Sequence, residues 1–304
     1  MNEERYINVL KAIGIISVVC GHLFEECRWM FMYHMPLFFI LSGYTFKPNK
    51  YSFGDFVKKK FRHLIIPYFS YFLLILVLNS LIHPLPLREF LRSFLLPVYG
   101  GQKMAGIYGV FWFINVYFLG IITFKVLFEK IKQWTLLLIF VLSYVLAGFQ
   151  NVPWNIQVVP MAISYMCIGI LLQKCKTYLL ELKRECVYLG IAALLGVPFI
   201  PKALLIDMKT ADYGVPLISF VVSVLIVILL LVMSYRLAKR FDYGGGDLMG
   251  KSSMVIMYLH QFIHFTFQER IPNLIILMLC ILLPLMFEKL IVRNKILSLY
   301  FLGK

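Results

Sequence analysis

Ten apolar runs recur along the chain and limit its possible folds more than any other feature. They lie near residues 7–24, 31–46, 64–83, 108–128, 134–149, 156–173, 186–200, 214–234, 253–268 and 273–292. About 17 to 25 apolar residues are enough for a helix to cross roughly 30 Å of hydrocarbon. Because 61% of all residues are hydrophobic and only 15% are charged, this apolar surface exceeds what a soluble core buries.

The runs predict transmembrane helices. Lipid tolerates no unpaired backbone, so a spanning segment is either a helix or part of a closed barrel, and these runs lack the polar alternation of barrel strands. The longest gaps, about residues 84–107 and 47–63, are too short for a soluble domain. We therefore expect an all-α fold: a polytopic transmembrane helical bundle that forms a single membrane domain over residues 1–304.

The distribution of Lys and Arg predicts the orientation. With ten spans and the N-terminus inside, 23 of the 30 basic residues fall in cytoplasmic segments and 7 on the opposite side, as the positive-inside rule requires. We expect a multi-pass protein of the cell inner (cytoplasmic) membrane with both termini cytoplasmic. The start has no cleavable signal pattern, so the first span is expected to remain as an anchor. The net charge of +15 reflects orientation and attraction to the lipid bilayer, and no nucleic acid partner is expected.

Ionisable residues in the first apolar run suggest a polar face inside the bundle. Lys11 and His22 are eleven residues apart, which is three helical turns plus about 20°, so they share one face. Such a face is expected to line the bundle interior or a wet cavity. The alternatives are that Lys11 reaches the membrane surface and that His22 only pairs with a neighbouring group.

A carboxylate lies close to this histidine in sequence. If the helix persists, Glu26 stands one turn beyond His22 and could orient the imidazole as a general base for a hydroxyl nucleophile. Glu25 is the rival carboxylate. His34 begins the next run and should lie beside His22 if the two helices are antiparallel. Two histidines and a carboxylate are a weak metal signal, and the six cysteines show no CxxC spacing, so no metal is expected.

Three later segments carry further candidates. "KKKFRHLIIPY", from Lys58, is either a stop-transfer cluster or an anion site in which Lys59 and Arg62 reach phosphates from one helical face. "GVFWFINVYF" places Trp112 near an outer boundary, where aromatic belts are normal. In "SSMVIMYLHQFIH", His260 and His264 are either interfacial histidines or a metal couple. The run "DYGGGDLMGK" is expected to be a flexible cytosolic loop.

Taken in order, these segments resemble the acyltransferase 3 family of integral membrane acyltransferases. The resemblance rests on Lys11 and His22, followed by "YHMPLFFILSGY" from Tyr33, and then on "KKKFRHLIIPY", "FWFINVYF" and "SMVIMYLH". It covers about residues 5–290, and its first 45 residues are the specific part. Lys11 stands where the family usually has Arg, and Lys59 stands at the first position of its Arg-x-x-Arg pair, so the bidentate fork is lost at both.

The resemblance implies an O-acyltransferase of cell-surface glycans, with acetyl-CoA or another acyl-CoA as donor and an extracytoplasmic glycan as acceptor. On this basis Lys11, Lys59 and Arg62 are expected to bind the donor. His22 is expected to act as base or acyl carrier, with Glu26 or Glu25 orienting it. The expected substrate-binding residues are His34, Trp112, Tyr258 and His260.

Two other functions fit a polytopic bundle with intramembrane charges. A secondary transporter or flippase would use them as a proton relay, although inverted repeats and paired broken helices are not evident. A polysaccharide polymerase or ligase would need a large outer loop, and the loop near residues 84–107 is modest.

Overall fold

The computed structural model describes residues 3–128, 133–240 and 244–304, and these residues form helices and turns with no β-strand. Within them, six helical segments are long and apolar enough to cross a membrane: Glu4–Leu23, Phe53–Ile82, Gly106–Leu127, Pro153–Lys174, Ile218–Arg240 and Asn273–Ile291. The prediction of an all-helical membrane protein is confirmed. The count of ten spans and the placement of the termini remain predictions.

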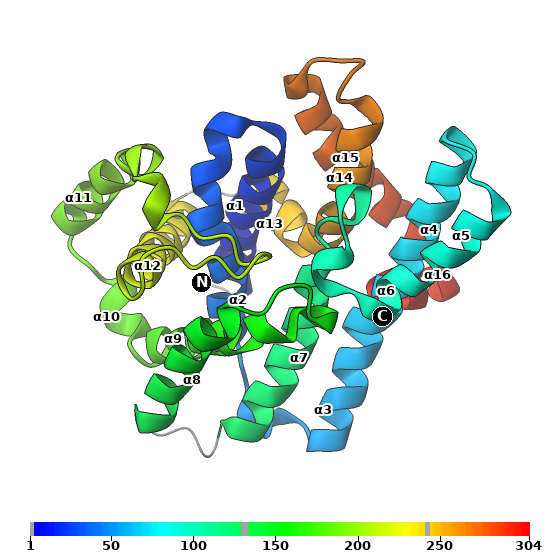
Figure 1. Cartoon of the computed structure of the whole chain (residues 1–304). Coiled ribbons are helices and arrows are strands. Elements are labelled where there is room, and N and C mark those ends of the chain that lie inside the picture. The colour runs from blue at the N-terminus through cyan, green and yellow to red at the C-terminus, as the bar shows by residue number, and fades with distance from the viewer. Residues whose placement is uncertain (1–2, 129–132, 241–243) are drawn as a thin grey trace. The chain divides into compact units, whose positions relative to one another are not determined.

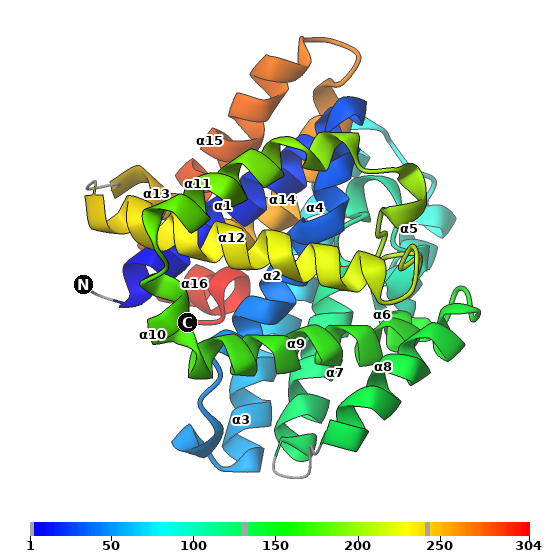
Figure 2. The same ribbon diagram turned by 90° about the vertical axis from the view of Figure 1, so that its left-hand side faces the viewer.

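The chain divides into two compact units. Figures 1 and 2 label the helices that make up each of them. The first unit comprises Met1–Lys47, Ile131–Gly148 and Pro160–Ser253, and the second comprises Pro48–Lys130, Phe149–Val159 and Met254–Lys304. The helices of the first are α1 (Glu3–Leu23), η1 (Glu25–Met30), α2 (Phe31–Tyr44), α8 (Gln133–Ala147), α9 (Val159–Lys174), α10 (Lys176–Leu180), α11 (Arg184–Leu195), α12 (Ile218–Arg240) and α13 (Gly244–Lys251). Those of the second are α3 (Phe53–Lys60), η3 (Phe61–Ile65), α4 (Ile66–Ile82), α5 (Leu87–Ser93), α6 (Leu95–Tyr99), α7 (Trp112–Leu127), η6 (Pro153–Val158), α14 (Ser253–Phe267), α15 (Asn273–Ile291) and α16 (Lys295–Leu302).

Helices α1 and α2 form an antiparallel hairpin at the start of the first unit. The hydroxyls of Tyr6 and Tyr44 hydrogen-bond at 2.9 Å near one end of the pair, and those of Ser17 and Tyr33 at 2.8 Å toward the other. A residue early in α1 thus pairs with one late in α2, and the reverse also holds. Each hydrogen bond gives buried hydroxyls a partner, which apolar packing alone would not supply.

Glycines allow α2 and α9 to approach closely. A Cβ on Gly43 would lie 1.9 Å from the Met166 carbonyl oxygen, and one on Gly169 would lie 2.0 Å from the Ile40 carbonyl oxygen. No side chain fits at either position, so the two backbones touch where these glycines face each other. Small residues at helix contacts are typical of membrane proteins.

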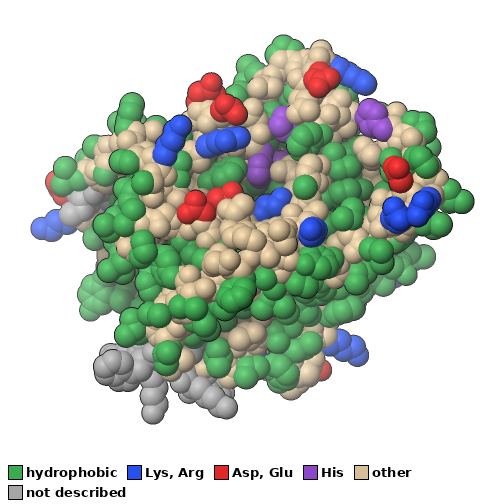
Figure 3. All heavy atoms as spheres, viewed as in Figure 1, with side chains coloured by type: hydrophobic (Ala, Val, Ile, Leu, Met, Phe, Trp, Pro, Cys, Tyr) green, Lys and Arg blue, Asp and Glu red, His purple; other side chains and the backbone are tan. Residues whose placement is uncertain are grey.

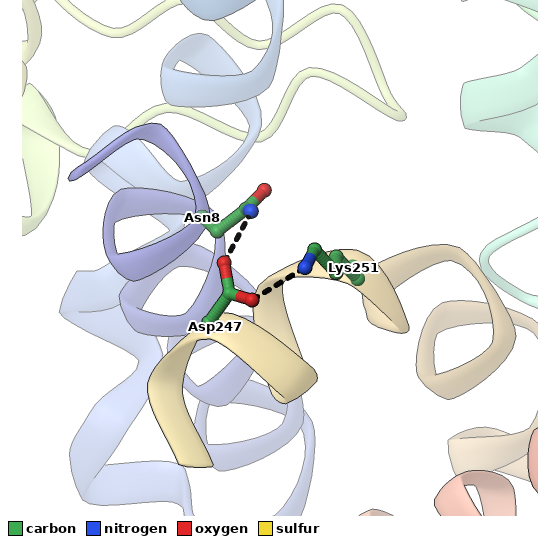
Figure 4. A network of polar contacts seen from close by, with 3 residues as sticks. All are labelled: Asn8, Asp247 and Lys251. Carbon is green, nitrogen blue, oxygen red and sulfur yellow. Dashed lines mark hydrogen bonds and ion pairs between the residues drawn. The ribbon is translucent and has the colours of Figure 1, made fainter. Parts of the chain in front are cut away.

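The segment that was expected to be a loop is helical from Gly244 and docks on α1. The residues before it, 241–243, lie outside the described part. Asp247 of α13 accepts a hydrogen bond from the Asn8 side chain at 2.6 Å and one from Lys251 at 2.5 Å (Figure 4). A Cβ on Gly250 would lie 2.0 Å from the Asn8 carbonyl oxygen. Contact with α1 therefore stabilises a helix that its four glycines disfavour.

In the second unit, α3 continues through η3 into α4. Ser52 caps α3: its hydroxyl accepts from the Asp55 backbone N–H at 3.2 Å and donates to the Asp55 carboxylate at 2.7 Å. The turn η3 is a π-helix, a wider winding than the α-helices on either side. Pro67, which has no N–H to donate, is the second residue of α4 and lies directly after this turn.

Apolar side chains remain exposed along α15. Leu274, Met278, Leu282, Met286 and Leu290 recur every four residues and form a stripe that winds around the helix, and each residue is 54 to 63% exposed. Figure 3 shows hydrophobic side chains exposed widely over one face of the molecule, with charged side chains in separate groups. An apolar stripe of this length is incompatible with water and is typical of a surface that faces lipid.

Candidate functional site

Two histidines meet at the turn between α1 and α2. His22 is in the last turn of α1 and His34 in the first turn of α2, and their ring centroids are 6.4 Å apart with an interplanar angle of 46°. Phe31 packs edge-on against both, at 5.2 Å from His22 and 4.9 Å from His34. His34 is 3% exposed and His22 is partly accessible. The antiparallel hairpin thus brings the two imidazoles together, as the sequence predicted.

Lys11 lies on the same continuous helix as His22. Because α1 is unbroken from Glu3 to Leu23, the eleven-residue spacing places both side chains on one face, about 16 Å apart along the axis. Both are partly buried. The polar face predicted from the spacing is therefore present in the first unit.

The two glutamates do not follow His22 on that helix. The α-helix ends at Leu23, Phe24 is extended (φ −120°, ψ 122°), and Glu25–Met30 form a 3₁₀ helix. Both carboxylates are exposed, and Glu25 pairs with Arg28 at 3.5 Å. The one-turn relation between His22 and Glu26, which required a longer helix, is thus wrong, while a role for either carboxylate stays a prediction.

Basic residues of the second unit gather around aromatic rings. Lys59 donates a hydrogen bond to the Tyr51 hydroxyl at 2.7 Å and lies over its ring, 4.5 Å from the centroid. Lys50 approaches the same ring at 5.5 Å. The hydrogen bond from Lys59, with a smaller effect of both ammonium charges, lowers the pKa of Tyr51. Sequence reasoning missed Tyr51, because a single tyrosine beside lysines has no distinctive pattern.

Arg62 projects from the π-helical turn η3 and is exposed. Lys59 precedes this turn in α3, so the α-helical winding from which a shared face was predicted does not continue to Arg62, and the shared face stays a prediction. A Cβ on Gly303 would lie 2.5 Å from the Arg62 carbonyl oxygen, so the segment after α16 touches the backbone of this turn. Single π-helical turns are frequent at functional sites.

Tyr258 and His260 are buried on α14. Tyr258 stacks on Tyr71 with centroids 4.4 Å apart, and its hydroxyl points to the Leu64 carbonyl of η3 at 3.5 Å. His260 is 0% exposed, and its Nδ1 is 3.1 Å from the Ile256 carbonyl oxygen. His260 is thus enclosed by protein, and its expected position near the membrane interface stays a prediction. Trp112, the first residue of α7, is also buried.

A group of side-chain amides in the second unit escaped sequence analysis. The Asn115 side-chain oxygen accepts from the Gly101 N–H at 3.2 Å and from the Tyr68 hydroxyl at 3.5 Å. The Asn155 side-chain oxygen accepts from the Gln102 N–H at 2.9 Å. The adjacent glycines 100 and 101 were the only hint in the sequence, because paired glycines indicate unusual backbone, and both do have positive φ. Buried loop amides otherwise have no periodicity from which to predict them.

The expected site residues thus form two sets. Those in the first unit are Lys11, His22, Glu25, Glu26 and His34, and those in the second are Lys59, Arg62, Trp112, Tyr258 and His260. The first set contains imidazoles suited to proton transfer or acyl transfer. In the second set, Lys59 and Arg62 supply exposed cations suited to phosphates, and the aromatic and histidine side chains are buried.

The chain matches a known protein family over most of its length. The family described as "Acyltransferase domain", acyltransferase 3, matches residues 4–287. Nodulation protein NolL of Mesorhizobium japonicum is 25% identical over 191 residues, which are 56% of this chain and 48% of NolL. The match thus spans about half the length of this relative. No solved structure matches the chain.

Proposed function

Because the chain belongs to the acyltransferase 3 family of membrane proteins, we propose that it is an integral membrane O-acyltransferase of the cell inner membrane. In this proposal it moves an acyl group, most simply acetyl, from cytosolic acyl-CoA to a hydroxyl of an extracytoplasmic polysaccharide or glycolipid. The family match over residues 4–287 carries the proposal. The paired imidazoles and the basic residues supply chemistry that suits it.

Exposed cations are proposed to hold the donor. Lys59 and Arg62 bind phosphate oxygens of CoA, and Lys11 guides the thioester toward His22. Lys59 is held by Tyr51 through a hydrogen bond and through its ring face, which fixes a long side chain in one place. An ammonium that is already ordered loses less conformational freedom when a phosphate binds.

His22 is proposed to carry out the transfer. As general base, it takes the proton of the acceptor hydroxyl while the hydroxyl oxygen attacks the thioester carbonyl and the CoA thiolate leaves. As acyl carrier, its nitrogen first displaces the thiolate, and the acceptor hydroxyl then displaces the imidazole. The thiolate takes up the proton in either case, so free CoA and an ester are the products.

The remaining residues are proposed to support this step. Glu26, or failing that Glu25, orients His22 from the 3₁₀ segment. His34, whose ring centroid is 6.4 Å from that of His22, contacts the acceptor beside the reacting imidazole. Trp112, Tyr258 and His260 contribute to acceptor binding or to polarising the carbonyl. The reaction itself requires no metal.

Inverted membrane vesicles test the proposal, since they expose the cytosolic face to an added donor. Vesicles with and without the protein receive acetyl-CoA labelled in the acetyl group, and label is measured in the extracted glycan and glycolipid fractions. We expect alkali-labile label in these fractions, with release of free CoA, only when the protein is present. Movement of glycan without consumption of acetyl-CoA would contradict the proposal and favour a flippase.

A further inference from the structure

Asn115 offers a buried donor with a fixed orientation. The side chain is 0% exposed, and its oxygen is held by the Gly101 N–H and the Tyr68 hydroxyl. These contacts direct the opposite end of the amide, Nδ2, away from both. Among the described residues no group accepts a hydrogen bond from Nδ2. Native proteins rarely leave a buried donor in this state, and such a donor calls for an explanation.

Gln157 is a second buried amide, and both its nitrogen and its oxygen lack a hydrogen-bond partner among the described residues. It lies in η6, two residues beyond Asn155, and is 2% exposed. In the described part of the chain neither Nε2 nor Oε1 has a hydrogen-bond partner. One donor group and one acceptor are therefore held inside the second unit with no protein partner to satisfy them.

The backbone of the surrounding loops lies very close to these amides. A Cβ on Gly100 would lie 2.5 Å from the Asn115 side-chain oxygen, and one on Gly101 would lie 2.7 Å from the Asn155 nitrogen. Trp154 and Asn155 themselves have positive φ, 57° and 52°. Such backbone is unfavourable for residues other than glycine, and it occurs preferentially at ligand sites.

Hydrogen bonds hold this backbone in place. The Trp154 indole N–H donates to the Val98 carbonyl at 2.8 Å, and the Gln102 N–H donates to Asn155 at 2.9 Å. The residues 97–104 and 150–158 are thus joined to each other around Asn115. A rigid frame keeps the two amides at fixed positions, as a binding site requires.

We propose that Asn115 and Gln157 bind hydroxyl groups of the sugar acceptor; the inference rests on the proposed transfer to glycan hydroxyls. A hydroxyl both donates and accepts, so it matches the Nδ2 donor of Asn115 and both ends of the Gln157 amide. A site built to hydrogen-bond a hydroxyl rejects an analogue that lacks it. These amides thus select the acceptor through its hydroxyl pattern.

The chemistry of the cluster favours a neutral sugar over a phosphate. The side-chain oxygens of Asn115 and Asn155 accept hydrogen bonds from backbone N–H groups and a tyrosine hydroxyl. Lys103 is nearby in sequence but is exposed. Phosphate recognition in proteins relies on Arg and Lys, which carry the opposite charge, whereas amides suit uncharged hydroxyls.

The test uses purified full-length protein in detergent, so that both faces are accessible. The acceptor probe is an extract of envelope polysaccharide and glycolipid from producing cells that lack this protein, and the donor is labelled acetyl-CoA. The variants are Gln157→Met, which keeps the length of the side chain, and Asn115→Leu. The control is Gln268→Met, the same change at an exposed glutamine at the end of α14. Label capture is measured against extract concentration and against acetyl-CoA concentration, and the unfolding temperature is measured for each protein.

Gln157→Met should raise the apparent KM for the extract about five- to tenfold, as the loss of one or two neutral hydrogen bonds does. Its KM for acetyl-CoA and its unfolding temperature should equal those of wild type, because the lost atoms have no partner in the described protein. Asn115→Leu should also raise the KM for the extract. It should lower the unfolding temperature as well, because the Gly101 N–H loses its acceptor, whereas the Tyr68 hydroxyl keeps the Pro97 carbonyl at 2.9 Å.

An unchanged KM for the extract in Gln157→Met, with wild type active, would overturn the inference and leave the proposed function standing. A fall in kcat alone would overturn it too, since the amide would then act on the reaction and not on acceptor binding. If wild-type protein captures no label from the extract, the proposed function fails, and this inference fails with it.

Discussion

The imidazoles of His22 and His34 lie 6.4 Å apart between ring centroids, across the turn that joins α1 to α2. Each belongs to the helix end nearest this turn, and Phe31 packs edge-on against both rings. The spacing lets one small group contact both histidines. A reacting imidazole and an acceptor-contacting imidazole can therefore be positioned by a single helical hairpin.

The hydroxyl pair of Ser17 and Tyr33 should couple this hairpin to activity. Tyr33→Phe removes a buried hydrogen bond of 2.8 Å in the residue before His34, so we expect a loss of about 1 kcal/mol in the free energy of unfolding and a lower kcat. Ser17→Ala should have a similar effect. The free energy of unfolding of the two single variants and of the double variant measures the energy of the Ser17–Tyr33 hydrogen bond. If the losses of the two single variants simply add up in the double variant, the hydrogen bond contributes nothing.

Lys59→Ala should weaken donor binding. A charge-assisted hydrogen bond to phosphate contributes about 1.5 to 3 kcal/mol, so the KM for acetyl-CoA should rise about 10- to 100-fold. Acetyl-pantetheine, which has the thioester but no phosphate, should show no such change. The matched control is Lys174→Ala, at an exposed lysine that ends α9. Equal effects on both donors would show that Lys59 does not bind phosphate.

Gly43→Ala should disrupt the contact of α2 with α9. Its Cβ would lie 1.9 Å from the Met166 carbonyl oxygen, and backbone cannot move away as a flexible side chain can. We expect a loss of stability of about 1 to 3 kcal/mol or more, seen as a lower unfolding temperature. Gly54→Ala, where the new Cβ meets nothing within 4 Å, is the matched control and should be neutral or slightly stabilising. Similar losses in the two variants would argue against backbone contact at Gly43.

Docking of α13 on α1 should weaken in acid. The hydrogen bond from Lys251, followed by the one from Asn8, lowers the pKa of Asp247 below its ordinary value of 3.8. A carboxyl whose pKa is lower in the folded protein stabilises it above pH 3.8, and this stabilisation is lost as the pH falls through the folded value. Asp247→Asn should therefore be less stable than wild type at pH 7, and the difference should shrink toward pH 3. Thermal unfolding across this range checks it, with exposed Glu269→Gln as control; a difference independent of pH would contradict the assignment.

Sequence patterns predicted the helical membrane fold and the antiparallel first hairpin, because apolar length and local periodicity decide both. They also predicted that Lys11 and His22 share one face, since α1 is unbroken between them. The pairing of Glu26 with His22 failed because α1 stops at Leu23. The nearby glycine, Gly21, lies inside the last turn and not after it, where a glycine would indicate a helix end.

Features that depend on tertiary contact could not be predicted. Helix α13 begins with three glycines and forms against α1 through Asp247 and Gly250. The π-helical turn at Arg62 and the amides of Asn115 and Gln157 depend on segments that are far apart in sequence. Their positions are set by packing and by hydrogen bonds between loops, for which one sequence has no periodic signal.

The most direct test of the account compares His22→Ala with His34→Ala in the labelled acetyl-CoA assay, with folding checked by thermal unfolding of each purified variant. His22→Ala should unfold at nearly the wild-type temperature and transfer no measurable acetyl group, because the reacting nitrogen is gone. His34→Ala should retain transfer at a reduced rate with a higher KM for the acceptor. Wild-type transfer by a folded His22→Ala variant would contradict the claim that this imidazole carries out the reaction.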